Sequence, residues 1–204
     1  MSAGVEELAE RGMPATFFVA PGCLEDHVFW WDALAGASGI LDPALRRYAL
    51  EQLDGMNERV HDWARSTGRR YDVQLPPHAR TASAGELRSA LSAPGMTIGS
   101  HSWSHANLAA LSPTAIDAEL RKTKEWLERE FPDKALPWLA YPYGLDSTNA
   151  REVAARLGYV GALRVSGGWH HTETAAALGL PRLNVSAGIS LAGFGARMNG
   201  AVRA

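Results

Sequence analysis

Short apolar runs alternate with helical patterns along most of this chain, and this rhythm limits the folds that it can adopt. The clearest run, residues 14–20 (PATFFVA), is rich in aromatic and β-branched residues and is stopped by Pro21-Gly22. Such a run predicts a strand buried on both faces, as in a parallel sheet. Further runs of this kind lie at residues 96–99, 137–141, 159–163 and 180–185. Repeated strand–helix alternation predicts βαβ units, and therefore an α/β fold built on a parallel sheet or barrel.

The segments before and between these runs carry signals for the ends of helices. Residues 3–11 have a helical composition that stops at Gly12. Ser112-Pro113 is typical of a helix start, because serine caps the first turn and proline is tolerated there. Residues 147–157 (STNAREVAARL) end at Gly158, directly before a predicted strand. We therefore expect helices at these places, and the two later ones each join two strands of the sheet.

Residues 24–82 interrupt the alternation. They contain FWWDALAG and then a long helical segment that begins at Asp42-Pro43, another cap followed by proline. We interpret residues 24–82 as a mainly helical insertion between two consecutive barrel strands. A length of 204 residues suits one domain, so we expect residues 1–204 to form a single domain that includes this insertion.

Composition excludes several classes of function. The net charge is -2 and no basic run is longer than Arg69-Arg70, which argues against nucleic acid or an anionic membrane as a partner. The single cysteine, Cys23, excludes an intrachain disulfide. No stretch approaches the ~20 apolar residues that span a bilayer, and the first residues lack the features of a signal peptide. We therefore expect no membrane span and a cytoplasmic location.

The segment IGSHSWSH at residues 98–105 carries the most chemistry. It follows a predicted strand, at the end where barrel folds build their active sites. His101 and His105 are four residues apart, so a turn or the start of a helix brings both imidazoles to one side. Two neutral imidazoles with a carboxylate and an open position are typical of a catalytic zinc site. The alternative interpretation is that this spacing arises by chance and that both histidines are structural or solvated.

Several segments resemble the polysaccharide deacetylases, the family defined by the NodB homology domain. Residues 12–19 (GMPATFFV) look like the second strand of that family, and His101-Ser-Trp-Ser-His105 matches its H-[ST]-x-x-H metal motif. Residues 139–144 (LAYPYG) resemble its third motif, usually R-x-P-[YF]. The order and spacing of these matches are specific, and the resemblance covers most of the chain outside the insertion.

The resemblance implies a distorted (β/α) barrel that removes N-acetyl groups from an amino-sugar polysaccharide, a C–N bond that is not a peptide bond. It implies a divalent metal ion, most often Zn²⁺, with His101 and His105 as ligands. Tyr143 is then expected to supply a main-chain N–H donor to the reacting carbonyl. The carbohydrate is the expected partner; the oligomeric state stays open.

The chain differs from the family pattern because it lacks the aspartates of the family's first motif. The family carries an Asp-Asp motif before its G-[MI]-P-A-T-F-F segment, whereas the residues that precede Gly12 here contain no aspartate. We interpret this as an incomplete N-terminus, and a domain that has lost activity is the other interpretation. Ala140 stands at the arginine position of the third motif. The late L-x-[IL]-H motif is absent, so His170 and His171 are the remaining candidates for a general acid, or else part of a solvated turn.

Two other functions stay open: a catalytically inactive domain that binds carbohydrate or a partner, and a hydrolase of a small cyclic amide or ureide. Trp30-Trp31 could stack on sugar rings, although packing of the inserted helix explains such a pair more often. Two other residues also allow both a functional and a structural interpretation. Trp103 could line an acyl pocket or be buried beneath the loop, and Asp146 could be a substitute ligand or lie near a helix cap. We interpret Cys23 as a packed side chain. We interpret His27, His61 and His78 as surface residues.

Overall fold

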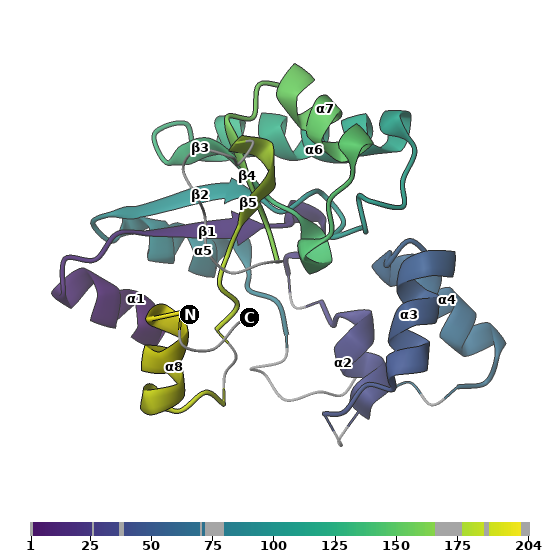
Figure 1. Cartoon of the computed structure of the whole chain (residues 1–204). Helices are drawn as coiled ribbons and strands as arrows, with labels where there is room; N and C mark the ends of the chain where they lie inside the picture. Colours follow the sequence, from purple (N-terminus) through teal and green to yellow (C-terminus); the bar gives the residue numbers. More distant parts are fainter. Residues whose placement is uncertain are drawn as a thin grey trace.

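A computed structural model describes residues 2–25, 27–36, 39–69, 71, 80–165, 177–185 and 188–200. Its centre is a five-stranded sheet in the order β1-β2-β3-β4-β5, and every neighbouring pair is parallel (Figure 1). The strands are β1 (Ala15–Val19), β2 (Met96–Ser100), β3 (Ala135–Ala140), β4 (Gly161–Arg164) and β5 (Leu180–Pro181). The predicted α/β fold with a parallel sheet is confirmed. Within the described residues the sheet is open.

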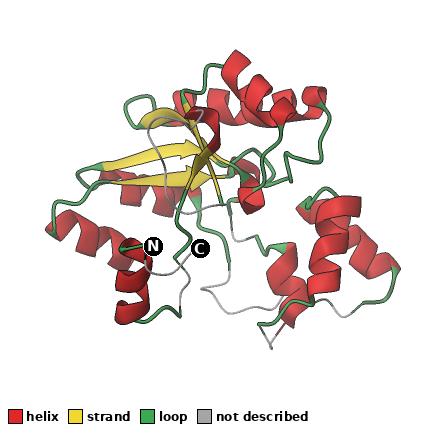
Figure 2. Ribbon diagram, in the orientation of Figure 1, coloured by secondary structure: helices red, strands yellow, loops and turns green. Residues whose placement is uncertain are grey.

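Helices cover the sheet on both sides, as expected for crossover connections between parallel strands. Figure 2 shows helices above and below the strands. The helices that join or flank strands are α1 (Ser2–Glu10), α5 (Ala84–Ser92), α6 (Pro113–Glu130), α7 (Thr148–Arg156) and α8 (Leu191–Met198). No helix among the described residues is long and apolar enough to cross a membrane.

Three further helices occur in the chain between β1 and β2. They are α2 (Trp30–Ala35), α3 (Pro43–Gln52) and α4 (Asn57–Ser66), and they lie to one side of the sheet (Figure 1). Their own small core contains Trp30, Ala49, Leu50 and Val60. The Asp42 side chain accepts a hydrogen bond from the Ala44 N–H at 2.7 Å, as predicted for the cap. These helices fall inside the predicted insertion, whose extent stays a prediction.

Two strand predictions need correction. Residues 14–20 were expected to be buried on both faces, but all five residues of β1 are only half-buried. The reason is position, because among the described strands β1 pairs with β2 alone and forms an edge of the sheet. The run at 180–185 forms a strand only at Leu180–Pro181.

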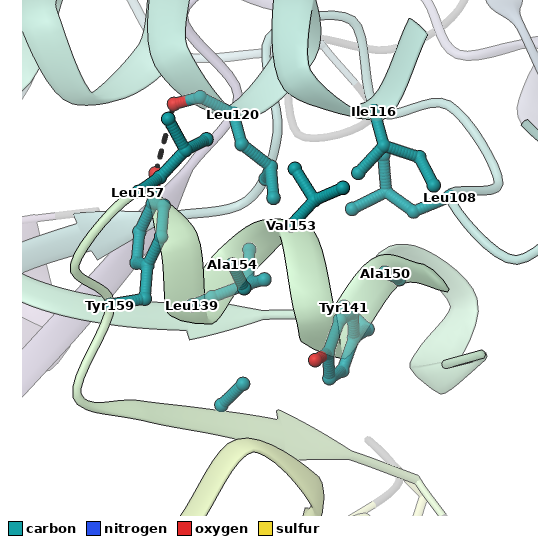
Figure 3. Close-up of a cluster of buried hydrophobic side chains, with 11 residues drawn as sticks. Leu108, Ile116, Leu120, Leu139, Tyr141, Ala150, Val153, Ala154, Leu157 and Tyr159 are labelled. Carbon is teal, nitrogen blue, oxygen red and sulfur yellow. Dashed lines mark hydrogen bonds between the residues drawn. The ribbon is translucent and has the colours of Figure 1, made fainter. Parts of the chain in front are cut away.

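The main core lies between α6, α7 and the strands β3 and β4 (Figure 3). The fully buried side chains in this cluster include Ile116, Leu120, Leu139 and Val153. The Tyr159 hydroxyl donates a hydrogen bond of 3.0 Å to the Leu120 carbonyl, drawn as a dashed line in Figure 3. Burial raises the pKa of the Tyr159 phenol to about 12.

We expect Tyr159→Phe to destabilise the protein by ~1 to 2 kcal/mol, because the substitution leaves the buried Leu120 carbonyl without this donor. Tyr48→Phe is the matched control, since the Tyr48 side chain is 41% exposed. Chemical denaturation of both variants measures the difference. Equal midpoints for the two variants would contradict a structural role for the Tyr159 hydroxyl.

Candidate functional site

The segment with the two histidines leaves the C-terminal end of β2. Ser100 pairs with Val19 across the β1–β2 ladder, and the next residue continues this contact because the His101 N–H donates to the Val19 carbonyl at 2.9 Å. Beyond it the backbone turns sharply, with φ of 62° at Ser102 and 59° at His105. Left-handed backbone at two non-glycine residues is uncommon and is often found at functional sites. The turn places this segment at the carboxyl edge of the parallel sheet, where binding sites of α/β folds lie.

The turn brings the two imidazole rings together. The ring centroids of His101 and His105 are 4.6 Å apart with an interplanar angle of 87°. His101 Nδ1 lies 2.6 Å from the Ala140 carbonyl oxygen, which can only accept, so Nδ1 carries the proton and Nε2 keeps its lone pair. Metal-ligating histidines are commonly fixed in this way by a main-chain carbonyl.

His105 has a nitrogen without a protein partner. Its Nδ1 is buried and makes no hydrogen bond within the described part of the chain. A buried polar atom without a partner is costly, and such atoms call for a functional explanation. This orphaned nitrogen and the fixed tautomer of His101 are what a divalent metal ion would require of imidazole ligands, so these two side chains fit such an ion as ligands.

Burial also keeps both rings neutral. It lowers the pKa of His101 to about 4, against the opposing effect of the bond to the Ala140 carbonyl. Burial and the neighbouring His101 together lower the pKa of His105 to about 3. Neutral imidazole is the form that ligates metals, so at neutral pH both side chains are in the correct protonation state.

Aromatic rings from two distant segments surround His105. Phe29 and Trp31 stack on each other at 4.2 Å and lie 5.3 and 5.1 Å from the His105 ring. Tyr143 approaches the same ring edge-on at 4.8 Å. Thus the region before and within α2 reaches the histidine site, a contact that sequence reasoning did not foresee.

Tyr143 lies in the short 3-10 turn η4 (Pro142–Gly144) that follows β3. Its φ of 58° is again left-handed, and Gly144 has a φ of 72°. The Tyr143 hydroxyl donates a 2.7 Å hydrogen bond to the Gly55 carbonyl. The sequence-predicted candidates Tyr143, His101 and His105 therefore lie together at the ends of β2 and β3.

Glu119 of α6 holds the turn between the histidines. Its carboxylate accepts hydrogen bonds from the main-chain N–H groups of Trp103 and Ser104, both at 2.9 Å, and from the Ser104 hydroxyl at 2.8 Å. Hydrogen bonds that main-chain N–H groups donate to a carboxylate are among the stronger hydrogen bonds in proteins. No sequence signal singles out this glutamate among the charged residues of α6.

We expect Glu119→Gln to weaken zinc binding by roughly 10-fold, because a looser turn no longer holds both imidazoles in place. Glu128→Gln is the matched control on the same helix, where Glu128 makes only a 3.7 Å surface ion pair with Lys124. Calorimetric zinc titrations of the two variants measure the effect. Equal affinities for both variants would show that Glu119 does not organise the turn.

The remaining candidates have different outcomes. Trp30 is 1% exposed, so its indole packs inside the protein and offers no open stacking face. Trp103 is half-buried, and the Lys122 ammonium lies over its ring, 3.8 Å from the ring centroid. Asp146 pairs with Arg151 at 3.3 Å, and Cys23 is buried. His78, His170 and His171 lie outside the described residues.

The fold and the site together define an α/β protein with two neutral imidazoles at the carboxyl edge of a parallel sheet, where α/β proteins bind their ligands. Within the described ranges, no group of three or more His, Cys, Asp or Glu could hold a metal ion. The sequence matches the family model described as polysaccharide deacetylase over residues 2–162. The chain therefore belongs to the polysaccharide deacetylase family.

Solved structures agree on the fold. The Streptococcus pyogenes deacetylase PplD, solved in complex with acetate, has a TM-score of 0.61 at 16% identity, over 96% of this chain and 63% of that one. BC0361, a polysaccharide deacetylase from Bacillus cereus, has a TM-score of 0.52 at 18% identity, over 71% of this chain and 49% of that one. The chain thus spans less than two thirds of either protein. No curated protein matches it.

Proposed function

We propose that this chain acts as a metal-dependent hydrolase that removes N-acetyl groups from an amino-sugar polysaccharide or a related glycan. The observation that carries the proposal is the pair of adjacent imidazoles, with centroids 4.6 Å apart, inside the segment that matches the family. The names of the similar proteins support removal of acetyl groups from a carbohydrate, since one is described as a deacetylase and another as a polysaccharide deacetylase.

His101 and His105 are the proposed ligands of the metal ion, most often Zn²⁺ in such sites. A bound divalent ion supplies Lewis acidity, which polarises a carbonyl group and makes water a better nucleophile at neutral pH. The fixed tautomer of His101 keeps one lone pair available for the ion, and aromatic rings pack beside His105.

Tyr143 is the proposed donor toward the substrate. Its main-chain N–H, at the end of β3, would bind the carbonyl oxygen as negative charge develops there. Donors fixed before the reaction stabilise such charge at no cost of reorganisation. His170 and His171 remain proposed proton donors to the leaving amine.

A domain that binds carbohydrate without cleaving it is the second candidate. It is favoured by one observation, that no described acidic or sulfur ligand accompanies the two imidazoles. With only two ligands we expect weak zinc binding, so that calorimetry finding sub-micromolar affinity would point to a third ligand. A small cyclic amide or ureide is the other possible substrate.

Release of acetate from N-acetylglucosamine oligomers, measured with added Zn²⁺ and again with a chelator, tests the proposal. Acetate release that the chelator abolishes is the expected result. Oligomer binding without acetate release would favour the binding domain, and ring opening of a cyclic ureide without acetate release would favour the third function.

A further inference from the structure

Trp30 connects the α2–α4 helices to the candidate site through hydrogen bonds. Its indole Nε1–H lies 2.9 Å from the Tyr143 hydroxyl oxygen and 3.1 Å from the Gly55 carbonyl oxygen. The Tyr143 hydroxyl in turn donates to the same Gly55 carbonyl at 2.7 Å. The three groups form a closed triangle, in which Trp30 and Tyr143 are 113 residues apart in the sequence.

This triangle holds a residue whose backbone is strained. Tyr143 has a φ of 58°, in the left-handed region that costs a non-glycine residue ~1 to 2 kcal/mol. Such a conformation persists only where the surroundings hold it. The triangle fixes the far end of the Tyr143 side chain, because the hydroxyl accepts from the Trp30 indole and donates to the Gly55 carbonyl.

Gly55 is shaped to receive the Tyr143 ring. It has a φ of 61°, and a Cβ atom at this position would lie 2.7 Å from Tyr143 Cε2 and 3.0 Å from its hydroxyl oxygen. Only a residue without a side chain allows this approach. The close contact and the hydrogen bonds therefore restrict the Tyr143 ring to one position against the α2–α4 helices.

We infer that Trp30 is a positioning residue for Tyr143. Its indole N–H orients the phenol, and the phenol in turn holds the left-handed backbone that aims the Tyr143 main-chain N–H at the substrate carbonyl. The inference rests on the proposed function for that N–H. It gives the α2–α4 helices a role in the reaction, because they carry Trp30 and Gly55 to a site built on β2 and β3.

Trp30→Phe is the variant that isolates the indole N–H, because phenylalanine keeps an aromatic ring in the same core. The Gly55 carbonyl retains its bond from the Tyr143 hydroxyl, so the fold should survive. Trp63→Phe is the matched control: Trp63 belongs to the same helical cluster and packs on Tyr48 at 4.9 Å, away from the triangle. Tyr143→Phe removes the hydroxyl from the other side of the triangle.

The inference predicts that Trp30→Phe lowers kcat for acetate release by roughly 10-fold with KM within twofold, since only the orientation of a donor changes. Trp63→Phe should leave both constants within twofold. The double variant Trp30→Phe/Tyr143→Phe should be no slower than the slower single variant, because both substitutions open one triangle. Additive losses in the double variant, or equal losses in Trp30→Phe and Trp63→Phe, would overturn the inference.

A measurement without turnover separates this inference from the proposed function. The amide resonance of Tyr143 in ¹⁵N-labelled protein should shift in Trp30→Phe and stay in place in Trp63→Phe. If the unmodified chain releases no acetate, the proposed function fails, while a shift confined to Trp30→Phe still supports the positioning of Tyr143. An unchanged Tyr143 amide in Trp30→Phe overturns the inference whatever the activity.

Discussion

Replacing His101 or His105 by alanine is expected to reduce zinc affinity and acetate release by more than ~100-fold. Loss of an outer partner of a metal ligand costs ~10- to 100-fold in affinity, and loss of a ligand should cost more. Each substitution removes one of two imidazoles that the turn after β2 brings within 4.6 Å of each other. Zinc calorimetry and an acetate-release assay measure the two effects.

His27→Ala is the matched control for both variants. His27 is exposed and lies between β1 and α2, outside the His101–His105 pair. Its loss should leave zinc affinity and turnover within twofold of the unmodified chain. Full activity in either His101→Ala or His105→Ala would exclude the pair as the metal site.

Gly144→Ala is expected to destabilise the protein by ~3 kcal/mol or more, through two effects at once. Gly144 has a φ of 72°, and a Cβ atom there would lie 2.3 Å from the Val165 Cβ and 2.6 Å from the Val165 main-chain nitrogen. A left-handed alanine costs ~1 to 2 kcal/mol, and overpacking of this kind costs a further ~1 to 3 kcal/mol. Because η4 also carries Tyr143, activity should fall with stability.

Gly12→Ala isolates the conformational part of this cost. Gly12 has nearly the same φ, 63°, but nothing lies within 4 Å of a Cβ atom built there. We expect a loss of only ~1 kcal/mol for it. For a chain of this size ~3 kcal/mol lowers Tm by roughly 6 to 12 °C, so thermal melts separate the two variants. Similar melting temperatures for both would show that the Val165 contact relaxes without cost.

Local signals predicted the elements of the fold well. The Ser112 hydroxyl accepts from the Ala115 N–H at 3.3 Å, as the Ser112-Pro113 signal indicated, and α7 begins after the Ser147 cap. The strands at 96–100 and 161–164 also formed where apolar runs indicated them. The half-exposure of β1 was missed because it depends on the order of strands in the sheet, which local sequence does not encode.

The candidate site was predictable only in part. The spacing of His101 and His105 predicted that their rings meet, although a left-handed turn brings them together. The support around them comes from residues far away in the sequence, such as Glu119 on α6 and Trp30 on α2. These contacts depend on how helices pack onto the sheet, so no short sequence motif predicts them.

X-ray absorption at the zinc edge, with protein in excess over zinc, tests most directly whether His101 and His105 share one ion. We expect two imidazole nitrogens at ~2.0 to 2.1 Å from the metal. That number should fall below two in both His101→Ala and His105→Ala. A zinc environment that is unchanged in both variants would contradict the assignment of these two histidines as ligands.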